Sequence, residues 1–375
     1  MKKLLLAVFS ITTTFSLYAQ REVPQERMEQ IYEEVKTPYK YGLAIAPADN
    51  HHKIDCPTVF RQGDKWLMTY VVYNGKSGTD GRGYETWIAE SDNLLEWRTL
   101  GRILSYRDGK WDCNQRGGFP ALPDMEWGGS YELQTYKGRH WMTYIGGEGT
   151  GYEAVKAPLY IGLASTKGDI STAHEWESLD KPILSIHDKD AQWWEKLTQY
   201  KSTVYWDKDK TLGAPFVMYY NAGGRHPETD LKGERVGIAL SKDMKTWKRY
   251  PGNPVFAHEA DGTITGDAHI QKMGDVYVMF YFSAFEPSRK YKAFNTFAAS
   301  YDLVNWTDWK GADLIIPSKN YDELFAHKSY VVKHDGVVYH FYCAVNNSEQ
   351  RGIAIATSKP MRRSAVRFPQ PDIKG

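Results

Sequence analysis

The chain repeats one pattern of β-strands five times, and this repetition limits its fold more than any other feature. Each copy contains an aromatic-rich run whose residues alternate in character, as they do along a strand. The five runs are WLMTYVVYN from Trp66, WMTYIGGEG from Trp141, FVMYYNAGG from Phe216, YVMFYFSAF from Tyr277 and VYHFYCAVN from Val338.

A second alternating run follows each of these and completes the unit. The second runs are ETWIAES (85–91), LYIGLAS (159–165), RVGIALS (235–241), TFAASYD (296–302) and GIAIATS (352–358). Four of the five are followed by a tryptophan, at Trp97, Trp176, Trp247 and Trp306. Units of four strands in about 60 to 75 residues match the blades of a β-propeller. We therefore predict an all-β, five-bladed β-propeller. A two-sheet sandwich or two tandem β domains are the alternatives, and the regular spacing without a linker argues against them.

Two segments stand out from the strand pattern. PQERMEQIYEEVK (24–36) predicts a short N-terminal helix, whereas DAQWWEKL (190–197) is either a weaker helix or a loop. The fifth unit lacks its tryptophan strand. We expect the ring to be closed either by SAVRF (364–368) or by YGLAIAP (41–47) from the amino end.

The first twenty residues have two lysines, an apolar stretch and a small residue at Ala19, which is typical of a secretory signal peptide. A membrane anchor is the weaker alternative because Thr12, Thr13 and Thr14 interrupt the apolar run. We thus expect a signal peptide over 1–19, one catalytic domain over 20–375, and a periplasmic or secreted protein. The formal charge is only +1, which argues against nucleic acid or a membrane surface as a partner. We expect a monomer.

The first strand of each propeller blade lines the central channel, so polar residues at its start should meet in one pocket. Asp55 lies there in the first unit, level with Gly129-Ser130 in the second and Gly266-Asp267 in the fourth. The catalytic candidates are Asp55, Glu132, Asp267 and His327. The candidates for substrate binding are Lys201, His269, Lys328, Glu153, Gln115 and Trp127.

Carboxyl groups beside lysines and histidines suit cleavage of a glycosidic bond, which needs one ionised carboxylate and one group that carries a proton. Cationic neighbours lower one pKa while burial raises the other, and this separates the two roles. An inverting reaction places the pair roughly 6.5–9.5 Å apart. Asp55 could instead cap a turn, and His327 could be structural. Three scattered cysteines do not suggest a zinc site. No cofactor is expected, although a structural divalent cation at His269 or His327 is an open alternative.

The whole pattern resembles the five-bladed β-propeller glycoside hydrolases, which include families 43, 117, 130 and 32. IDCPTVFRQGDKWLMTYV is similar to the first-blade motif of family 43, in which an Asp-Pro pair precedes the strand, although here Cys56 separates Asp55 from Pro57. The resemblance implies that Asp55 is the general base. It also implies a glutamate acid and a second aspartate, for which Glu132 and Asp267 are the best-placed residues.

Families 117 and 130 suggest other roles for the same channel. By resemblance to family 117, His327 could supply the acid. By resemblance to the phosphorylases of family 130, Lys201, Lys328 and Arg225 could hold phosphate. The predicted function is an exported, exo-acting and inverting glycoside hydrolase that acts on polysaccharide-derived oligosaccharides. A glycoside phosphorylase and a non-catalytic glycan-binding propeller are the alternatives.

Overall fold

The structure is a computed structural model that describes residues 22–153, 156–258 and 262–370. The predicted signal peptide lies outside the described residues. Among the residues described, none of the helices combines the length and the apolar character that crossing a membrane requires.

The described chain consists of a helix, α1 (Gln25–Val35), a strand, β1 (Tyr39–Ile45), and then a series of antiparallel meanders. The first meander contains β2 (His52–Gln62), β3 (Lys65–Asn74), β4 (Tyr84–Ser91) and β5 (Arg98–Leu104). The second contains β6 (Gln115–Pro120), β7 (His140–Gly147), β8 (Tyr160–Thr166) and β9 (Glu177–Ser178). A 3₁₀ turn, η1 (Trp193–Glu195), precedes the third, which contains β10 (Thr198–Trp206), β11 (Phe216–Arg225), β12 (Lys232–Ser241) and β13 (Trp247–Arg249).

The fourth meander contains β14 (Ile264–Met273), β15 (Val276–Ala284), β16 (Ala293–Ser300) and β17 (Thr307–Asp308). The fifth contains β18 (Phe325–His334), β19 (Val337–Val345) and β20 (Arg351–Thr357). A single parallel pair, Glu234 with Ile264, joins the third meander to the fourth. The helix expected over 24–36 is confirmed as α1, and the weaker one at 190–197 is only the turn η1.

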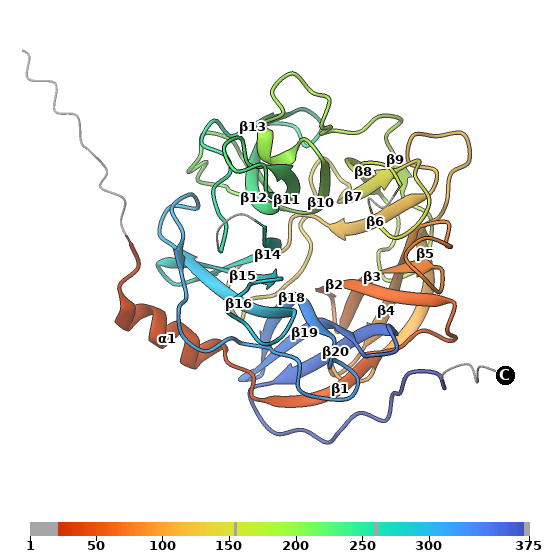
Figure 1. The fold of residues 1–375 in the computed structure, drawn as a ribbon, viewed down its shortest axis with the longest axis vertical. Helices are drawn as coiled ribbons and strands as arrows, with labels where there is room; N and C mark the ends of the chain where they lie inside the picture. The colour runs from red at the N-terminus through yellow and green to blue at the C-terminus, as the bar shows by residue number, and fades with distance from the viewer. Residues whose placement is uncertain (1–21, 154–155, 259–261, 371–375) are drawn as a thin grey trace, which may run out of the picture.

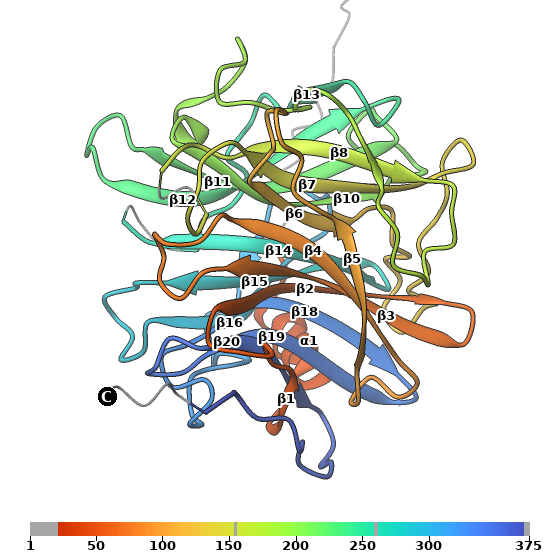
Figure 2. The same ribbon diagram turned by 90° about the vertical axis from the view of Figure 1, so that its right-hand side faces the viewer.

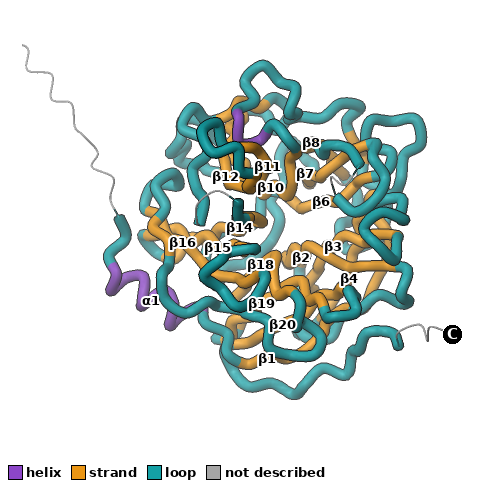
Figure 3. The backbone as a smooth tube through the Cα atoms, in the orientation of Figure 1, coloured by secondary structure: helices purple, strands orange, loops and turns teal. Residues whose placement is uncertain are grey.

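The meanders surround a common centre, with β2, β6, β10, β14 and β18 nearest to it (Figure 1). Seen from the side, β13 lies at the top of the molecule and β1 at the bottom (Figure 2). Among the residues that the structure describes, helix is confined to α1 and one short turn, so the prediction of a nearly all-β protein is confirmed (Figure 3). The core lies between neighbouring sheets, where Val59 and Met68 of the first meander pack with Val332 and Phe341 of the fifth. Burying these aliphatic and aromatic faces holds adjacent sheets together.

The amino-terminal strand completes the fifth meander, because β1 pairs antiparallel with β20. A lone bridge between Leu43 and Val366 brings the carboxy-terminal segment against the same strand. Both segments that were expected to close the ring therefore meet at β1, with 41–47 supplying the strand.

The first strand of the second meander was predicted wrongly. Its place is taken by the glycine-rich strand β6, and not by the segment around Gly129-Ser130. Glycine in β6 leaves room for a neighbouring strand, because a Cβ on Gly118 would lie 2.4 Å from the sulfur of Met142 and would force that side chain to move. Sequence reading takes such a glycine pair for a loop, since glycine weakens an isolated strand.

The innermost strands bend at corresponding places, and these bends shape the centre. Register shifts interrupt β2 between Asp55 and Thr58, β14 between Gly266 and His269, and β18 between His327 and Tyr330. Within them, Cys56, Asp267 and Lys328 adopt left-handed backbone angles, with φ of 51°, 57° and 60°. A β-bulge re-aims side chains that a regular strand would send into the neighbouring sheet.

Candidate active site

The bulged ends of the inner strands surround a cavity of about 170 Å³, called here the central pocket. Every meander contributes to its wall. The lining residues with polar or charged side chains include Tyr152, Glu153, Tyr200, Lys201, Asn221, Glu234, Asp267, His327, Lys328 and Arg351. Phe119, Ile145, Phe282 and Phe325 supply apolar wall between them. A small cavity with convergent polar groups in an apolar wall is typical of a site that binds a small organic ring.

Glu234 stands at the start of β12, at the junction with the fourth meander. Its backbone N–H donates to the carbonyl oxygen of Thr263 at 3.0 Å, and its Oε2 accepts from Nδ2 of Asn221 at 3.2 Å. Burial, reinforced by the negative charge of Glu153, raises the pKa of Glu234 to about 8. The Glu234 carboxyl is therefore protonated at neutral pH and can donate a proton.

Glu153 lies in the loop between β7 and β8, with a left-handed φ of 51°. Its Oε1 accepts a hydrogen bond from Nζ of Lys328 at 2.9 Å and another from the hydroxyl of Tyr84 at 3.4 Å. The Glu153–Lys328 contact is an ion pair, so the pocket holds one ion-paired carboxylate and one protonated carboxyl group. Such a division of environment separates acid from base in glycosidases.

Lys201 and Asp267 face each other across another part of the wall. Nζ of Lys201 lies 3.6 Å from Oδ2 of Asp267, and both side chains are buried. Burial raises the pKa of Asp267 even though Lys201 opposes this. Within the described structure, neither of these two atoms has a hydrogen-bond partner. Buried polar groups are normally paired, so this pair is ready to bind the hydroxyl groups of a ligand.

Asp55 lies behind the pocket wall and is not among the lining residues. Its Oδ2 accepts from Nζ of Lys328 at 2.7 Å, from Arg351 at 3.4 Å and from the hydroxyl of Tyr152. Burial would raise the pKa of Asp55, but the positive charges of Lys328 and Arg351 outweigh it and hold the pKa well below its usual range. The geometry makes Asp55 the anion that fixes these three pocket residues, whereas the sequence predicted it to be the general base.

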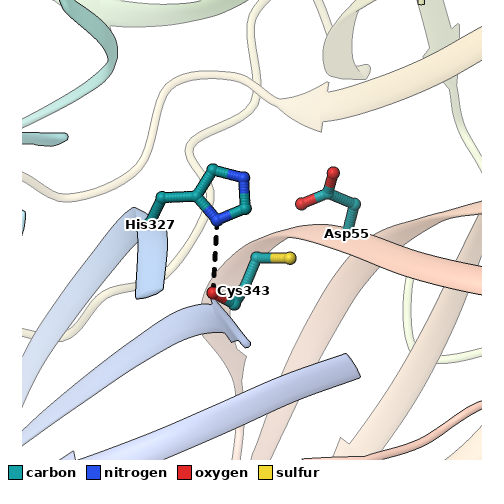
Figure 4. A group of neighbouring side chains, drawn as sticks. All are labelled: Asp55, His327 and Cys343. Carbon is teal, nitrogen blue, oxygen red and sulfur yellow. Dashed lines mark hydrogen bonds between the residues drawn. The ribbon is translucent and has the colours of Figure 1, made fainter. Parts of the chain in front are cut away.

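His327 lines the pocket, with Nδ1 3.3 Å from the carbonyl oxygen of Cys343. Burial lowers the pKa of His327 to about 3, so the imidazole is neutral near pH 7 and is a poor source of an acid proton. Asp55, His327 and Cys343 place one possible ligand atom each within 4.8 Å of one another (Figure 4). Zinc accepts this donor set. However, Lys328 and Arg351 already pair with the carboxylate, and a divalent cation would lie beside both charges. The arrangement therefore fits a metal poorly.

Two other predicted residues lie one layer away from the pocket. His269 is buried and stacks on Tyr330, with 3.7 Å between ring centroids. Gln115 is also buried, and its Nε2 donates to the carbonyl oxygens of Gly149 at 2.9 Å and Gly151 at 2.8 Å. Neither side chain lines the central pocket, although the sequence predicted that both bind substrate. Gln115 instead holds the loop that carries Glu153.

Glu132 and Trp127 lie at the opposite end of the molecule's centre, so their expected place in the pocket is wrong. Glu132 is exposed, and its backbone forms a bridge with Arg61, at the far end of β2 from Asp55. The indole of Trp127 donates to Glu34 of α1 at 2.8 Å. The reason is that the segment after β6 crosses to the other end of the inner strands, which follows from the misplaced second meander.

Sequence reasoning missed five residues as candidates for this pocket, namely Glu234, Tyr152, Arg351, Tyr200 and Asn221. The sequence contained one signal for Glu234. A glutamate lies just after a glycine at the start of the third strand in two meanders, as Glu85 in Gly83-Tyr84-Glu85 and as Glu234 in Gly233-Glu234. Arg351 likewise begins β20. Which of these residues turn inward depends on how the sheets meet, and no local pattern gives that.

Comparison with known proteins places this geometry in context. No protein-family model matches the chain, and no curated protein matches it. A solved structure described as a glycoside hydrolase is 95% identical, with a TM-score of 0.93, over 94% of this chain and 100% of that chain. The chain belongs to the glycoside hydrolases. A second structure with the same identity, coverage and TM-score is described as a BT0996 complex with RGII.

More distant structures share the fold of this glycoside hydrolase. A thermostable family-43 glycoside hydrolase is 16% identical over 85% of this chain and 97% of its own, with a TM-score of 0.55. A family 117 glycoside hydrolase from Zobellia galactanivorans, at 13% identity, has a TM-score of 0.58 over 87% of this chain and 91% of its own. A structure from the GH130 family of mannoside phosphorylases and hydrolases is also similar. The resemblance seen in the sequence is confirmed.

Proposed function

We propose that this glycoside hydrolase cleaves terminal sugars with Glu153 and Glu234 as its paired carboxyl groups. The observation that carries the proposal is their contrast within one small pocket. Glu153 is ion-paired to Lys328, whereas burial raises the pKa of Glu234 to about 8. Two carboxyl groups in unlike environments are the usual machinery of glycoside hydrolysis.

In this mechanism Glu234 donates its proton to the glycosidic oxygen while the bond to the anomeric carbon breaks. Glu153, on the other side of the sugar, stabilises the positive charge that develops at that carbon. It also takes a proton from the water molecule whose oxygen bonds to the carbon, so the products are a free sugar and the leaving alcohol. Lys328 and its anchor Asp55 orient Glu153, and Lys201 with Asp267 hold the sugar hydroxyls. The protein groups thus supply proton transfer, charge stabilisation and positioning.

Inversion of the anomeric centre is the outcome we expect from the sequence. Inverting pairs are roughly 6.5–9.5 Å apart and retaining pairs about 5–5.5 Å apart, since only inversion leaves room for water between carboxyl and sugar. NMR spectroscopy of the first anomer released identifies the outcome directly. A retained anomer would make Glu153 a covalent nucleophile, with Glu234 still the proton donor, without changing the pair itself.

We also propose an exo mode of attack. A cavity of about 170 Å³ is smaller than the roughly 300–1,000 Å³ of pockets that enclose drug-sized ligands, so it suits one sugar ring and not an extended polymer. The substrate we propose is an oligosaccharide derived from RGII, because the 95%-identical relative is described as a complex with RGII.

Hydrolysis is a better proposal than phosphorolysis, the second function considered from the sequence. Lys328 and Arg351 are engaged by Asp55, Glu153 and the hydroxyl of Tyr152. Arg225 is exposed and is not among the lining residues of the pocket. A phosphate ion would have to compete with these internal anions for its cations.

Incubation of the purified protein with RGII oligosaccharides, with and without phosphate, tests the proposal. We expect one free monosaccharide, released only from the non-reducing end of an end-labelled substrate and independent of phosphate. A sugar phosphate, or internal cleavage products, would contradict hydrolysis or the exo mode respectively.

Architecture, export and assembly complete the proposal. We propose that the five meanders are the blades of one propeller, which an experimental structure tests.

Cell fractionation tests the export expected from residues 1–19, and analytical ultracentrifugation tests the expected monomer. We expect periplasmic or secreted protein and a mass of one polypeptide.

A further inference from the structure

A second and larger hollow lies on the outer side of the fifth meander. It encloses about 960 Å³ along β1, between the 314–321 loop and the carboxy-terminal segment 360–370, and is called here the β1 groove. Figure 1 shows β1 and the carboxy-terminal segment together at the lower edge of the molecule, away from the centre. Of the residues described, none lines both the β1 groove and the central pocket.

The β1 groove carries an excess of positive charge. Among the described residues, its lining contains four cationic side chains, Lys40, Lys319, Arg363 and Arg367, and no aspartate or glutamate. Lys40 is paired with the buried carboxylate of Asp322. The other three are exposed, and within the described ranges none of them forms an ion pair. Because the whole chain has a formal charge of only +1, this excess of positive charge is a local feature that favours an anionic ligand.

The remaining lining residues favour a sugar over a simple anion. Tyr39 is 46% exposed, and Tyr321 and Phe368 add two more aromatic rings. Aromatic faces pack well against flat, partly apolar rings. Amide and hydroxyl groups from Asn320 and Ser348 can bond to hydroxyls. A volume of about 960 Å³ is also near the upper limit for pockets that hold extended organic ligands, and far exceeds what one small ion needs.

We propose that the β1 groove is a second carbohydrate-binding site, which takes an oligosaccharide that bears carboxylate groups. Arg363, Arg367 and Lys319 bind the carboxylates, and the aromatic residues bind the ring faces. Guanidinium groups suit this because each can hold a carboxylate by two parallel hydrogen bonds.

The groove and the catalytic centre are linked through one turn. The β19–β20 turn lines the groove with Asn346, Ser348 and Gln350, and the next residue, Arg351, lines the central pocket. Both Asn346 and Arg351 lie at the end of the fifth meander that carries His327. An acidic glycan bound in the β1 groove therefore keeps the ends of its own branches close to the central pocket. The binding itself is independent of which residues catalyse cleavage.

Isothermal titration calorimetry with a hexamer of galacturonate tests the proposal, since its fully methyl-esterified form has the same backbone without the charge. The full-length protein carries Glu234→Gln to prevent turnover. We expect the acid hexamer to bind, and the ester to bind at least about tenfold more weakly. Raising the salt from about 20 to about 200 mM should weaken the acid hexamer further.

Substitutions locate the site. Arg363→Ala with Arg367→Ala should weaken the acid hexamer at least about tenfold. The melting temperature should change little, since both side chains are exposed and Arg367 donates only to the nearby carbonyl oxygens of Ser364 and Val366. Arg98→Ala, an exposed arginine of the first meander, should leave binding unchanged. Equal binding of the ester, no binding of the acid, or binding unaffected by the double substitution would overturn the proposal. So would a dimer that the double substitution disperses, because the groove would then be an interface between two copies.

Discussion

Nζ of Lys328 lies 2.7 Å from Oδ2 of Asp55, across the junction between the fifth and first meanders. Both groups are buried, and the same ammonium also reaches Oε1 of Glu153 at 2.9 Å. One residue pair therefore holds two sheets together and positions a carboxylate of the pocket. This double role explains why an acid stands in an otherwise apolar strand.

Asp55→Asn should destabilise the protein strongly, because it leaves the buried Lys328 and the partly buried Arg351 with one anion fewer. Breaking a buried pair from one side costs about 3–5 kcal/mol. Urea unfolding measures the change. Asp92→Asn is the matched control, since Asp92 forms an exposed pair with Lys65 whose loss should cost at most about 1 kcal/mol. Equal effects of the two substitutions would mean that the Asp55 pair contributes little.

The pH profile should reflect Glu234. Its folded pKa is about 8, so the protonated form that donates the proton is lost as the pH rises above that value. We expect kcat/KM to fall about tenfold per pH unit on the alkaline side. Glu153→Gln removes the negative charge that helps to raise this pKa, so the residual activity of that variant should decline from a lower pH. If the alkaline limb of the Glu153→Gln variant does not move, the group that causes this limb is not coupled to Glu153, and the assignment to Glu234 is contradicted.

The same group should make stability depend on pH in an uncommon direction. The folded state keeps the proton of Glu234 up to about pH 8, whereas an unfolded glutamate loses it near about pH 4.3. The folded state binds more protons across this window, so Glu234 contributes stability that declines as the pH rises through it. The melting temperature of wild type should therefore fall relative to that of Glu234→Gln between about pH 5 and 8. A constant difference would contradict the raised pKa.

Lys201 and Asp267 should govern substrate binding. Each offers the pocket a buried atom that has no hydrogen-bond partner within the described structure, although the two side chains form an ion pair with each other. A hydrogen bond to a charged group contributes about 1.5–3 kcal/mol, so Asp267→Asn or Lys201→Met should raise KM about 10- to 150-fold. The effects of the two substitutions on KM should be less than additive in the double variant, because either single substitution already removes the partner of the other residue. Unchanged KM in both single variants would remove the pair from the sugar-binding wall.

Removing divalent metals should leave activity unchanged. Asp55, His327 and Cys343 resemble a ligand set, yet the carboxylate is paired to Lys328 and Arg351. Dialysis against EDTA and, separately, Cys343→Ser should each keep kcat/KM within a factor of about two. Loss of activity on dialysis that zinc or calcium restores would show that a cation occupies the site after all.

Much of the strand pattern could be predicted because period-two alternation is a local property. The runs from Trp66, Phe216, Tyr277 and Val338 are all second strands of their meanders, as expected. The failure at β6 has a local cause too, since two adjacent glycines hide a buried strand.

Most of the predicted residues that do line the pocket lie on the inner strands, and Glu153, in the loop between β7 and β8, is the exception. Lys201, Asp267, His327 and Lys328 line one pocket because their strands start at the same end of the centre. Glu234 escaped prediction because it faces the pocket only through the junction of two meanders. A sequence pattern gives the order of strands, but it does not give the angle at which sheets meet.

The Glu153–Glu234 pair is tested most directly by the steady-state kinetics of Glu153→Gln and Glu234→Gln on an RGII oligosaccharide. Glu132→Gln is the matched control, since Glu132 is exposed at the opposite end of the centre. We predict that each pocket variant loses at least about 10²-fold in kcat while retaining its fold by circular dichroism, and that the control keeps full activity. Activity within about tenfold of wild type in both pocket variants would contradict the assignment of catalysis to this pair.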